Sequence, residues 1–387
     1  MTWFAAACGY VDVRWREASP GDRKTTADSL IPITVAMMTT TTGRGAPTGS
    51  QLRRALRTAF NTNRRTAEHS PETAAALRWA AENSRDIAEL AEPDRLRSVL
   101  AAIDTKLDGH RAAPNTVRLR RIALRGVITY GMEKEALTVN PLETVKTKKK
   151  PTTVVREVDR RAVVNPMQGR MLLDAVGTIA PRLVAFFGLM LYAGLRPEEA
   201  ANLRKTNLAL PREGWGDLNL DKAAPEVGAE WTDSGERSEE RGLKHRQEDD
   251  GRLVPCCPDL TDILWRHIDK YGTSADGRLF PGVRNNGRLG SSVYGRVWAK
   301  TRAGVFVPEV VESPLAKRPY DLRHACVSTW LVAGVEPTRV AAWAGHSVAV
   351  LLRVYAKFLD GGEQDARAKV ERLLGRPNHG ANRNDQR

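Results

Sequence analysis

Three basic side chains in this sequence stand at helix starts, where local rules do not favour a basic residue. Arg196 lies in AGLRPEEAANLR, Arg323 in YDLRHACVSTWL and His346 in WAGHSVAVLLRVYAKFL. Proline, aspartate and glycine–serine signals place each of them at the N-terminal end of a predicted helix. That end carries partial positive charge, which disfavours an arginine unless an anion lies there. If the three helix starts converge, two arginines and a histidine can hold one phosphate group.

A phosphate held in this way needs a nucleophile, and Tyr355 follows His346 by nine residues. The apolar residues around Tyr355 form one stripe of an amphipathic helix, so core packing is the simpler interpretation of this tyrosine taken alone. The stripe can also fix where the hydroxyl lies, which makes packing and chemistry compatible. A tyrosine with a pKa near ~10 needs cationic neighbours or a base. Lys244, in a hairpin predicted over 240–258, is a flexible cation that can protonate a departing oxygen.

The composition favours a nucleic-acid partner. The 387 residues include 60 Lys and Arg against 46 Asp and Glu, a net charge of +14, and a surplus of this size suits a polyanion or, alternatively, serves solubility. Four cysteines without a Cys-x-x-Cys pair and seven scattered histidines predict reduced thiols and no metal site. No apolar run reaches the ~18 residues of a membrane span and no secretion signal is present, so we expect a cytoplasmic, nucleoid-associated protein without a membrane partner.

The elements that must position these residues follow from helix starts, stops and breaks. We expect a mainly α-helical chain with a small β hairpin or sheet, an α+β class. The predicted organisation is a helical or irregular segment without a domain assignment over 1–65, a helical core DNA-binding domain over 66–145, a basic linker over 146–161, a mixed catalytic domain over 162–375 and a disordered tail over 376–387.

Basic residues on one predicted helix and in the linker are candidates for contact with a DNA backbone. A solvated helix face and a mere spacer are the simpler interpretations of each group taken alone. The candidates are Arg118, Arg121 and Arg125 on a helix predicted over 115–137, and Lys148, Lys149 and Lys150 in the linker.

The motifs resemble the four catalytic elements of the tyrosine recombinases, the phage-integrase family. AGLRPEEAANLR, LKHR with DGRLVP, YDLRHACVSTWL and WAGHSVAVLLRVYAKFL come in the family's order. The steps from Tyr320 to Arg323 and from His346 to Tyr355 are family spacings as well. The resemblance covers about 165–360 and is looser over the N-terminal helices.

The resemblance implies a role for each matching residue. Arg196 and Arg323 would clamp the scissile phosphate, and His346 would hydrogen-bond to it. Tyr355 would attack the phosphorus and form a 3′-phosphotyrosyl link, while Lys244 would be the general acid for the leaving 5′-oxygen.

One family position differs in this chain. Tyr320 stands where the family usually has histidine, and a tyrosine is a poor base near neutral pH. The identity of the base for Tyr355 therefore stays open. Glu199 matches an acidic position that supports the site. His324 is a second supporting residue, which we expect to point elsewhere because it lies one helical position beyond Arg323.

The resemblance also implies partners: double-stranded DNA with specific attachment sites, a homotetramer that exchanges C-terminal helices near 361–375, and accessory DNA-bending or directionality factors. It implies neither a metal nor a nucleotide cofactor, because a protein–DNA bond conserves the phosphodiester energy. The expected function is site-specific recombination for a phage or mobile element. Alternatives are a type IB topoisomerase and a DNA-binding protein that has lost catalysis, for which Tyr320 and the irregular first 65 residues argue.

Overall fold

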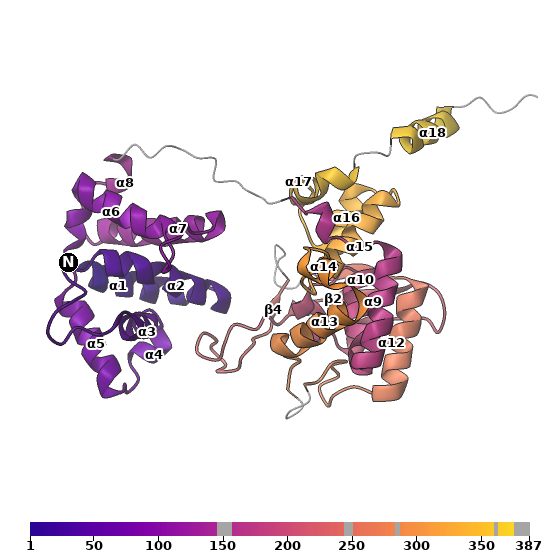
Figure 1. The fold of residues 1–387 in the computed structure, drawn as a ribbon, viewed down its shortest axis with the longest axis horizontal. Coiled ribbons are helices and arrows are strands. Elements are labelled where there is room, and N and C mark those ends of the chain that lie inside the picture. Colours follow the sequence, from indigo (N-terminus) through magenta and orange to yellow (C-terminus); the bar gives the residue numbers. More distant parts are fainter. Residues whose placement is uncertain (145–156, 244–250, 283–286, 360–362, 375–387) are drawn as a thin grey trace, which may run out of the picture. The chain divides into compact units, whose positions relative to one another are not determined.

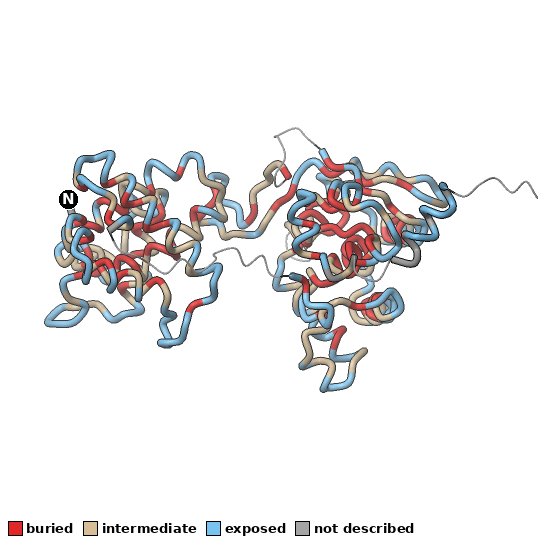
Figure 2. Tube along the Cα trace, turned by 90° about the horizontal axis from the view of Figure 1, so that it is seen from above, coloured by how far each residue is buried: buried red, intermediate tan, exposed pale blue. Residues whose placement is uncertain are grey.

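The chain, described by a computed structural model, comprises two compact units. Unit 1 consists of residues 1–154 and 225–239, and unit 2 consists of residues 155–224 and 240–387. Buried residues gather on the inside of each unit (Figure 2). The structure describes residues 1–144, 157–243, 251–282, 287–359 and 363–374.

Helices make up most of each unit, and the described strands form a three-stranded and a two-stranded antiparallel sheet (Figure 1). This confirms the predicted α+β class. In the part of the chain that the structure describes, no helix is at once long enough and apolar enough to cross a membrane.

Unit 1 is a helical bundle in which α7 packs against α1 and α2. The α1 and α7 backbones approach closely because Gly9 faces the ring of Tyr130 and Gly126 faces the ring of Tyr10, where no larger side chain fits. The helices are α1 (Trp3–Trp15), α2 (Pro20–Ala36), α3 (Gly49–Ala59), α4 (Thr62–Arg65), α5 (Pro71–Glu82), η1 (Ile87–Ala91), α6 (Pro93–Asp104), α7 (Pro114–Glu133) and α8 (Pro141–Thr144).

Two segments that the sequence left in doubt or placed elsewhere belong to the core of unit 1. Residues 1–65 contribute fully buried side chains such as Trp3 and Leu56, which share a cluster with Val127 of α7. Residues 225–239 lie within the predicted catalytic range, yet Trp231 is fully buried in this same cluster.

Unit 2 surrounds the helix α10, whose sequence VAFFGLMLY is apolar on all sides and is therefore buried. It contacts α9, α12 and α15. Its helices are η2 (Arg160–Ala162), α9 (Pro166–Ile179), η3 (Pro181–Leu183), α10 (Val184–Tyr192), α11 (Pro197–Asn202), η4 (Lys205–Asn207), α12 (Pro258–Tyr271), α13 (Ser291–Val305), α14 (Pro308–Glu312), α15 (Asp321–Val332), α16 (Pro337–Ala344), α17 (Val348–Leu359) and α18 (Glu363–Leu374).

The strands pair differently from the hairpin predicted over 240–258. The strand β5 pairs with β2, while β4 pairs with β3. The reason is matched faces: Leu218 and Leu220 of β2 and Val254 and Cys256 of β5 are all buried on one side of the sheet. The strands are β1 (Leu208–Ala209), β2 (Gly216–Leu220), β3 (Lys222–Ala223), β4 (Arg241–Gly242) and β5 (Arg252–Cys256).

A second, smaller apolar cluster in unit 2 joins α15, α16 and α17. It includes Val327 and Leu331 of α15, Val340 of α16, and Leu351 and Tyr355 of α17. Packing of these three helices sets the positions of Arg323, His346 and Tyr355 relative to one another.

Candidate active site

The three helix starts predicted from the sequence are present in unit 2. Arg196 directly precedes α11, and Arg323 lies in the first turn of α15. Gly345 ends α16 in the left-handed conformation with φ 65°, and the Ser347 hydroxyl accepts a hydrogen bond from the Val350 amide at 3.2 Å, at the start of α17. His346 lies in the turn between them.

The basic side chains at these helix starts meet around the turn that carries His346. The Arg196 guanidinium donates from Nη2 to the Gly345 carbonyl at 2.9 Å. Arg323 donates to the carbonyls of Ala344 and Gly194, and its Nη2 lies 2.9 Å from His346 Nε2. Residues far apart in the chain thus form one cationic cluster.

These contacts explain how unit 2 tolerates arginines at helix N-termini. Arg323 is fully buried, but its guanidinium reaches the carbonyls that follow α10 and end α16. Carbonyls at helix C-termini carry partial negative charge and favour a cation. Arg323 lies at the N-terminus of its own helix but is therefore stabilised by carbonyls at the C-terminal ends of α10 and α16.

Glu199 provides the anionic centre of the cluster. Its carboxylate accepts from Arg196 Nη1 at 2.7 Å and from Arg252 Nη1 and Nη2 at 3.0 and 2.7 Å. Burial opposes the charge on Glu199, but Arg252, Arg196 and Arg323 outweigh it and hold the pKa at about 2. The carboxylate is therefore ionised at neutral pH.

Arg252 is the residue of this site that sequence reasoning missed. It is only 2% exposed, and Gly345 must lack a side chain because the Arg252 guanidinium lies against its Cα. Strand alternation carried a signal: Arg252 falls on the same face of RLVPC as the buried Val254 and Cys256. A charged residue on a buried strand face requires a partner, here Glu199.

The Tyr355 side chain is enclosed, with 1% of its surface exposed. Its ring stacks on that of His346, with centroids 6.1 Å apart, and its hydroxyl lies 2.8 Å from His324 Nδ1. The backbone of Tyr355 leaves helical geometry, at φ −116° and ψ 15°, so α17 is kinked there. Burial raises the pKa of Tyr355 above its ordinary value of 10, against the lowering effect of Arg323.

The expectation that His324 points elsewhere is wrong. His324, Val327 and Leu331 follow one another at steps of three and four along α15, so they share one face. Val327 and Leu331 pack in the cluster that contains Tyr355, and His324 heads this stripe. Burial, followed by Arg323 and Arg318, lowers the pKa of His324 to about 4 despite the opposing Asp321 carboxylate.

His346 has a spare donor. Burial and the charges of Arg323, Arg196 and Arg252 lower its pKa to about 3, so the ring is neutral at pH 7. Because Nε2 faces the Arg323 guanidinium, the ring proton belongs on Nδ1. Both His346 Nδ1 and Arg323 Nε are buried and have no hydrogen-bond partner among the residues that the structure describes. The same holds for Arg252 Nε, so three donors of the site have no partner among the described residues.

Two comparisons with known proteins find no relative: no family model matches the chain, and no curated protein matches it. Solved structures do match. The integrase of transposon Tn1549, in complex with a circular intermediate DNA, aligns with a TM-score of 0.54 and 16% identity over 84% of this chain and 98% of that chain. The site-specific recombinase XerH, bound to difH substrate in a pre-cleavage complex, aligns with a TM-score of 0.52 and 12% identity over 97% of this chain and 96% of that chain. This chain has the tyrosine recombinase fold.

Within the tyrosine recombinase fold, Tyr320 lies beside the cluster. Its ring is 5.1 Å from that of His324 in an edge contact, and Arg323 Cζ is 6.0 Å from its centroid. Among the described residues, the hydrogen-bond partner of the Tyr355 hydroxyl is His324 Nδ1 and not Tyr320.

The remaining predicted residues are separate from this cluster or outside the description. Arg118 and Arg125 are exposed on α7 of unit 1, while Arg121 is half-buried with Nη2 3.6 Å from an Asp104 carboxylate oxygen. Lys244, Lys148, Lys149 and Lys150 lie outside the described residues.

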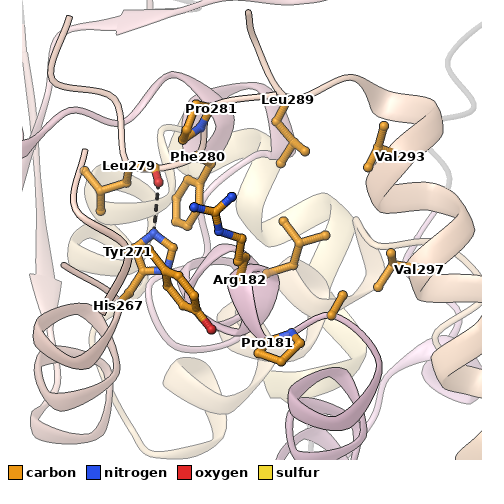
Figure 3. A pocket seen from close by; sticks show the side chains of 12 residues that line it. Pro181, Arg182, His267, Tyr271, Leu279, Phe280, Pro281, Leu289, Val293 and Val297 are labelled. Atoms are coloured by element: carbon orange, nitrogen blue, oxygen red, sulfur yellow. Dashed lines mark hydrogen bonds between the residues drawn. The ribbon is translucent and has the colours of Figure 1, made fainter. Parts of the chain in front are cut away.

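A pocket of about 280 Å³ lies elsewhere in unit 2 (Figure 3). Its lining is mainly apolar and comes from η3, α13 and the loop around Phe280, with His267 and Tyr271 contributed by α12. Inside it, the Arg182 guanidinium lies over the ring of Tyr271, with Cζ 5.1 Å from the centroid. His267 Nε2 is 2.9 Å from the Leu279 carbonyl oxygen. None of the residues of the cationic cluster lines this pocket.

Proposed function

We propose that this protein is a site-specific DNA recombinase that cuts and rejoins DNA strands through a 3′-phosphotyrosyl intermediate. The observation that carries the proposal is the meeting of Arg196, Arg323, His346 and Tyr355 in one enclosed cluster, although up to 159 positions separate them in the sequence. The fold supports it, because the Tn1549 integrase and XerH are a transposon integrase and a recombinase bound to DNA.

The proposed chemistry consists of three tasks. Arg196, Arg323 and His346 supply donors for the oxygens of a phosphodiester, whose negative charge grows during attack. The oxygen of Tyr355 forms a bond to phosphorus as the bond to the 5′-oxygen breaks. Lys244 is the candidate acid that protonates this departing oxygen. In the reverse step the 5′-hydroxyl attacks the phosphotyrosine and restores a DNA strand.

The described arrangement is closed, since Arg323 and Tyr355 are 0% and 1% exposed. We infer that the turn between α16 and α17 shifts when DNA binds, so that the phosphate replaces the carbonyls of Ala344 and Gly345 on the arginines. The kink at Tyr355 is a place where α17 can change direction.

The proposal extends to partners. Exposed Arg118 and Arg125 of α7, Arg121 and the linker lysines are candidate contacts to the DNA backbone. The helix α18, within residues 361–375, is the candidate element for exchange between four copies on paired attachment sites of a phage or mobile element. Accessory DNA-bending or directionality factors are further candidate partners.

The test is covalent trapping of DNA. Fragments of the genome that encodes the chain are nicked at low density, so that cleavage near a nick releases a short strand and blocks religation. The wild-type protein is expected to form an SDS-stable adduct, and mass spectrometry should find the nucleotide on Tyr355 after nuclease trimming. Tyr355→Phe should form no adduct, because the attacking oxygen is gone.

A matched control is Tyr294→Phe, a tyrosine of α13 in unit 2 outside the cluster. It should form adduct like the wild type. An adduct that persists in Tyr355→Phe, or a nucleotide found on another residue, would show that Tyr355 only packs.

A further inference from the structure

The proposed reaction lacks a proton acceptor for Tyr355, and the described structure offers one. His324 Nδ1 is 2.8 Å from the Tyr355 hydroxyl oxygen, which is hydrogen-bond distance for proton transfer. The two rings are close, with centroids 5.8 Å apart. Because Tyr355 is 1% exposed, bulk water does not compete effectively for this hydroxyl.

We propose that His324 accepts the proton of Tyr355 during DNA cleavage, a step that rests on the proposed function. As the tyrosine oxygen bonds to phosphorus, its O–H bond breaks and the proton passes to Nδ1, while Nε2 already carries the proton of the neutral ring. The bond from phosphorus to the 5′-oxygen breaks, and that oxygen takes a proton from a separate acid. When the strand is rejoined, the histidinium returns its proton to the tyrosine oxygen.

The surroundings of His324 favour the neutral imidazole, the form that can accept the Tyr355 proton. Its low pKa keeps the ring unprotonated at pH 7, so that the Nδ1 lone pair is free to accept. The approach of a phosphate would add negative charge near the ring, which stabilises the histidinium as it forms. The charged and titratable groups that face His324 are Arg318, Tyr320, Asp321 and Arg323 on its own element and the loop before it, Tyr355 from α17, and His346 from the turn before α17.

The position of His324 in the fold favours it over Tyr320 as the proton acceptor. His324 shares the face of α15 that packs against α17, together with Val327 and Leu331. Tyr320 precedes the first residue of α15, and its ring forms a T-shaped contact with that of His324, with 5.1 Å between centroids. Its aromatic ring can hold the His324 imidazole in place, which makes Tyr320 a positioning residue for the histidine.

The experiment measures the rate of adduct formation on the nicked DNA substrate. His324→Gln can still hydrogen-bond to Tyr355 but cannot take a proton, and its rate should fall by about 10²- to 10⁴-fold. Added imidazole should restore part of the rate of His324→Ala, because the small base can enter the space left by the side chain. Tyr320→Phe should lose less than His324→Gln, since it retains the ring that positions His324.

A matched control is His267→Gln, which alters a buried histidine of unit 2 that lies 2.9 Å from a backbone carbonyl and should leave the rate unchanged. If His324→Ala cleaves as fast as the wild type or faster, the contact with Tyr355 restrains the hydroxyl and does not serve catalysis. A larger loss in Tyr320→Phe than in His324→Gln also overturns the proposal. Failure of the wild type to form an adduct would instead count against the proposed function.

A second inference rests on a different part of the chain, residues 225–239, which we call the docking segment. It leaves unit 2 after β3 and returns to it before β4, and in between it packs on unit 1. Trp231 is fully buried there, with its ring 6.1 Å from that of Trp15 and the Arg57 guanidinium 5.6 Å from its centroid.

Polar contacts add to the packing of Trp231, and we call the two together the anchor. Arg23, 6% exposed, donates to the Trp231 carbonyl at 3.1 Å and forms a two-pronged ion pair with Asp233 at 2.7 and 2.9 Å. The Asn61 amide donates to the Glu230 carbonyl at 2.6 Å. Without the docking segment, a buried arginine would lose its counter-charge, which is costly.

The geometry points to a non-covalent lock: we infer that the docking segment holds unit 1 to unit 2 even when the linker between them is cut. The anchor combines a fully buried tryptophan, a residue type that often carries much of the energy of a protein interface, with a bidentate ion pair in which Arg23 is buried and Asp233 is exposed. The partner that this surface of unit 1 recognises is therefore a segment of the same polypeptide, inserted between two strands of unit 2.

The experiment places a recognition sequence for a specific protease within linker residues 146–156 of the full chain and cleaves it. Size-exclusion chromatography at physiological salt should show the two fragments eluting together at the position of the uncut protein. The same cleavage in Trp231→Ala with Asp233→Ala should release the N-terminal fragment, because both parts of the anchor are removed.

An exposed pair in unit 2, Trp215→Ala with Asp269→Ala, is the matched control and should not separate. Thermal unfolding of the uncut Trp231→Ala, Asp233→Ala variant distinguishes loss of the docking contacts from unfolding of unit 1. Separation of the wild-type fragments after cleavage overturns the inference, whatever the variants do.

Discussion

Replacing Arg323 by lysine is expected to lower the rate of adduct formation by roughly 10³- to 10⁵-fold, the range known for a single arginine in phosphoryl transfer. The guanidinium of Arg323 reaches two backbone carbonyls and His346 at once. Lysine retains the charge but offers a point contact instead of a planar fork. It can neither hold a phosphate by two oxygens nor keep His346 in place. The measurement is single-turnover cleavage of the nicked DNA at equal concentrations of folded protein.

Arg302→Lys is the matched control for this substitution. Arg302 is 5% exposed and donates to the carbonyls of Leu315 and Val311 at 3.0 and 3.1 Å, so it is a buried arginine that binds backbone oxygens outside the cluster. We expect Arg302→Lys to lower stability while the folded fraction cleaves at the wild-type rate. A rate for Arg323→Lys within tenfold of the wild type would limit Arg323 to a structural role.

The second large effect concerns stability. Glu199→Gln should lower the free energy of unfolding of unit 2 by about 3–5 kcal/mol, since it leaves the buried Arg252 without its counter-charge. Glu240→Gln is the matched control: Glu240 also pairs with two arginines, at 2.5 and 3.1 Å, but its side chain is 24% exposed. Its loss should cost at most about 1 kcal/mol. Urea unfolding at neutral pH measures the free energy of unfolding of both variants. Equal losses for Glu199→Gln and Glu240→Gln would contradict the role assigned to burial.

The pH dependence gives an independent check on the same carboxylate. The pKa of Glu199 is about 2 in the folded chain against an ordinary value of 4.5. A lowered folded-state pKa stabilises the protein above the ordinary value, and this stabilisation is lost as the pH falls towards 2. The shift corresponds to roughly 3 kcal/mol. The difference in stability between wild type and Glu199→Gln should therefore narrow as the pH is lowered from 4.5 towards 2.

Much of the architecture around the site could be predicted from local sequence. Pro197 marked the start of α11, and Gly345 with Ser347 marked the break between α16 and α17, because caps and turns depend on residues within one helical turn. The apolar stripe around Tyr355 correctly indicated a packed helix face. Spacing within each motif therefore predicted where Arg196, Arg323 and His346 stand on their own elements.

Other features depended on which elements pack together, and local patterns carry no such information. The pairing of Glu199 with Arg252 joins residues 53 positions apart, and it requires β5 to lie beside β2 and not in a hairpin with β4. The contact of His324 with Tyr355 depended on which face of α15 packs against α17. The position of residues 225–239 in unit 1 depended on contacts with Trp15 and Arg23, which form only after helices from distant parts of the chain have packed.

The sequence alone established that Tyr355 lies on a helix, within an apolar stripe and at a set distance along the chain from His346, because periodicity and turn chemistry are local. It left open whether the residue packs or reacts, and what accepts its proton. The tertiary structure buries the ring against His346 and places His324 Nδ1 at the hydroxyl, and our proposals for the nucleophile and for its proton acceptor rest on these contacts. The contact with His324 arises from the packing of α15 against α17, a long-range interaction driven by burial of Val327, Leu331 and Leu351.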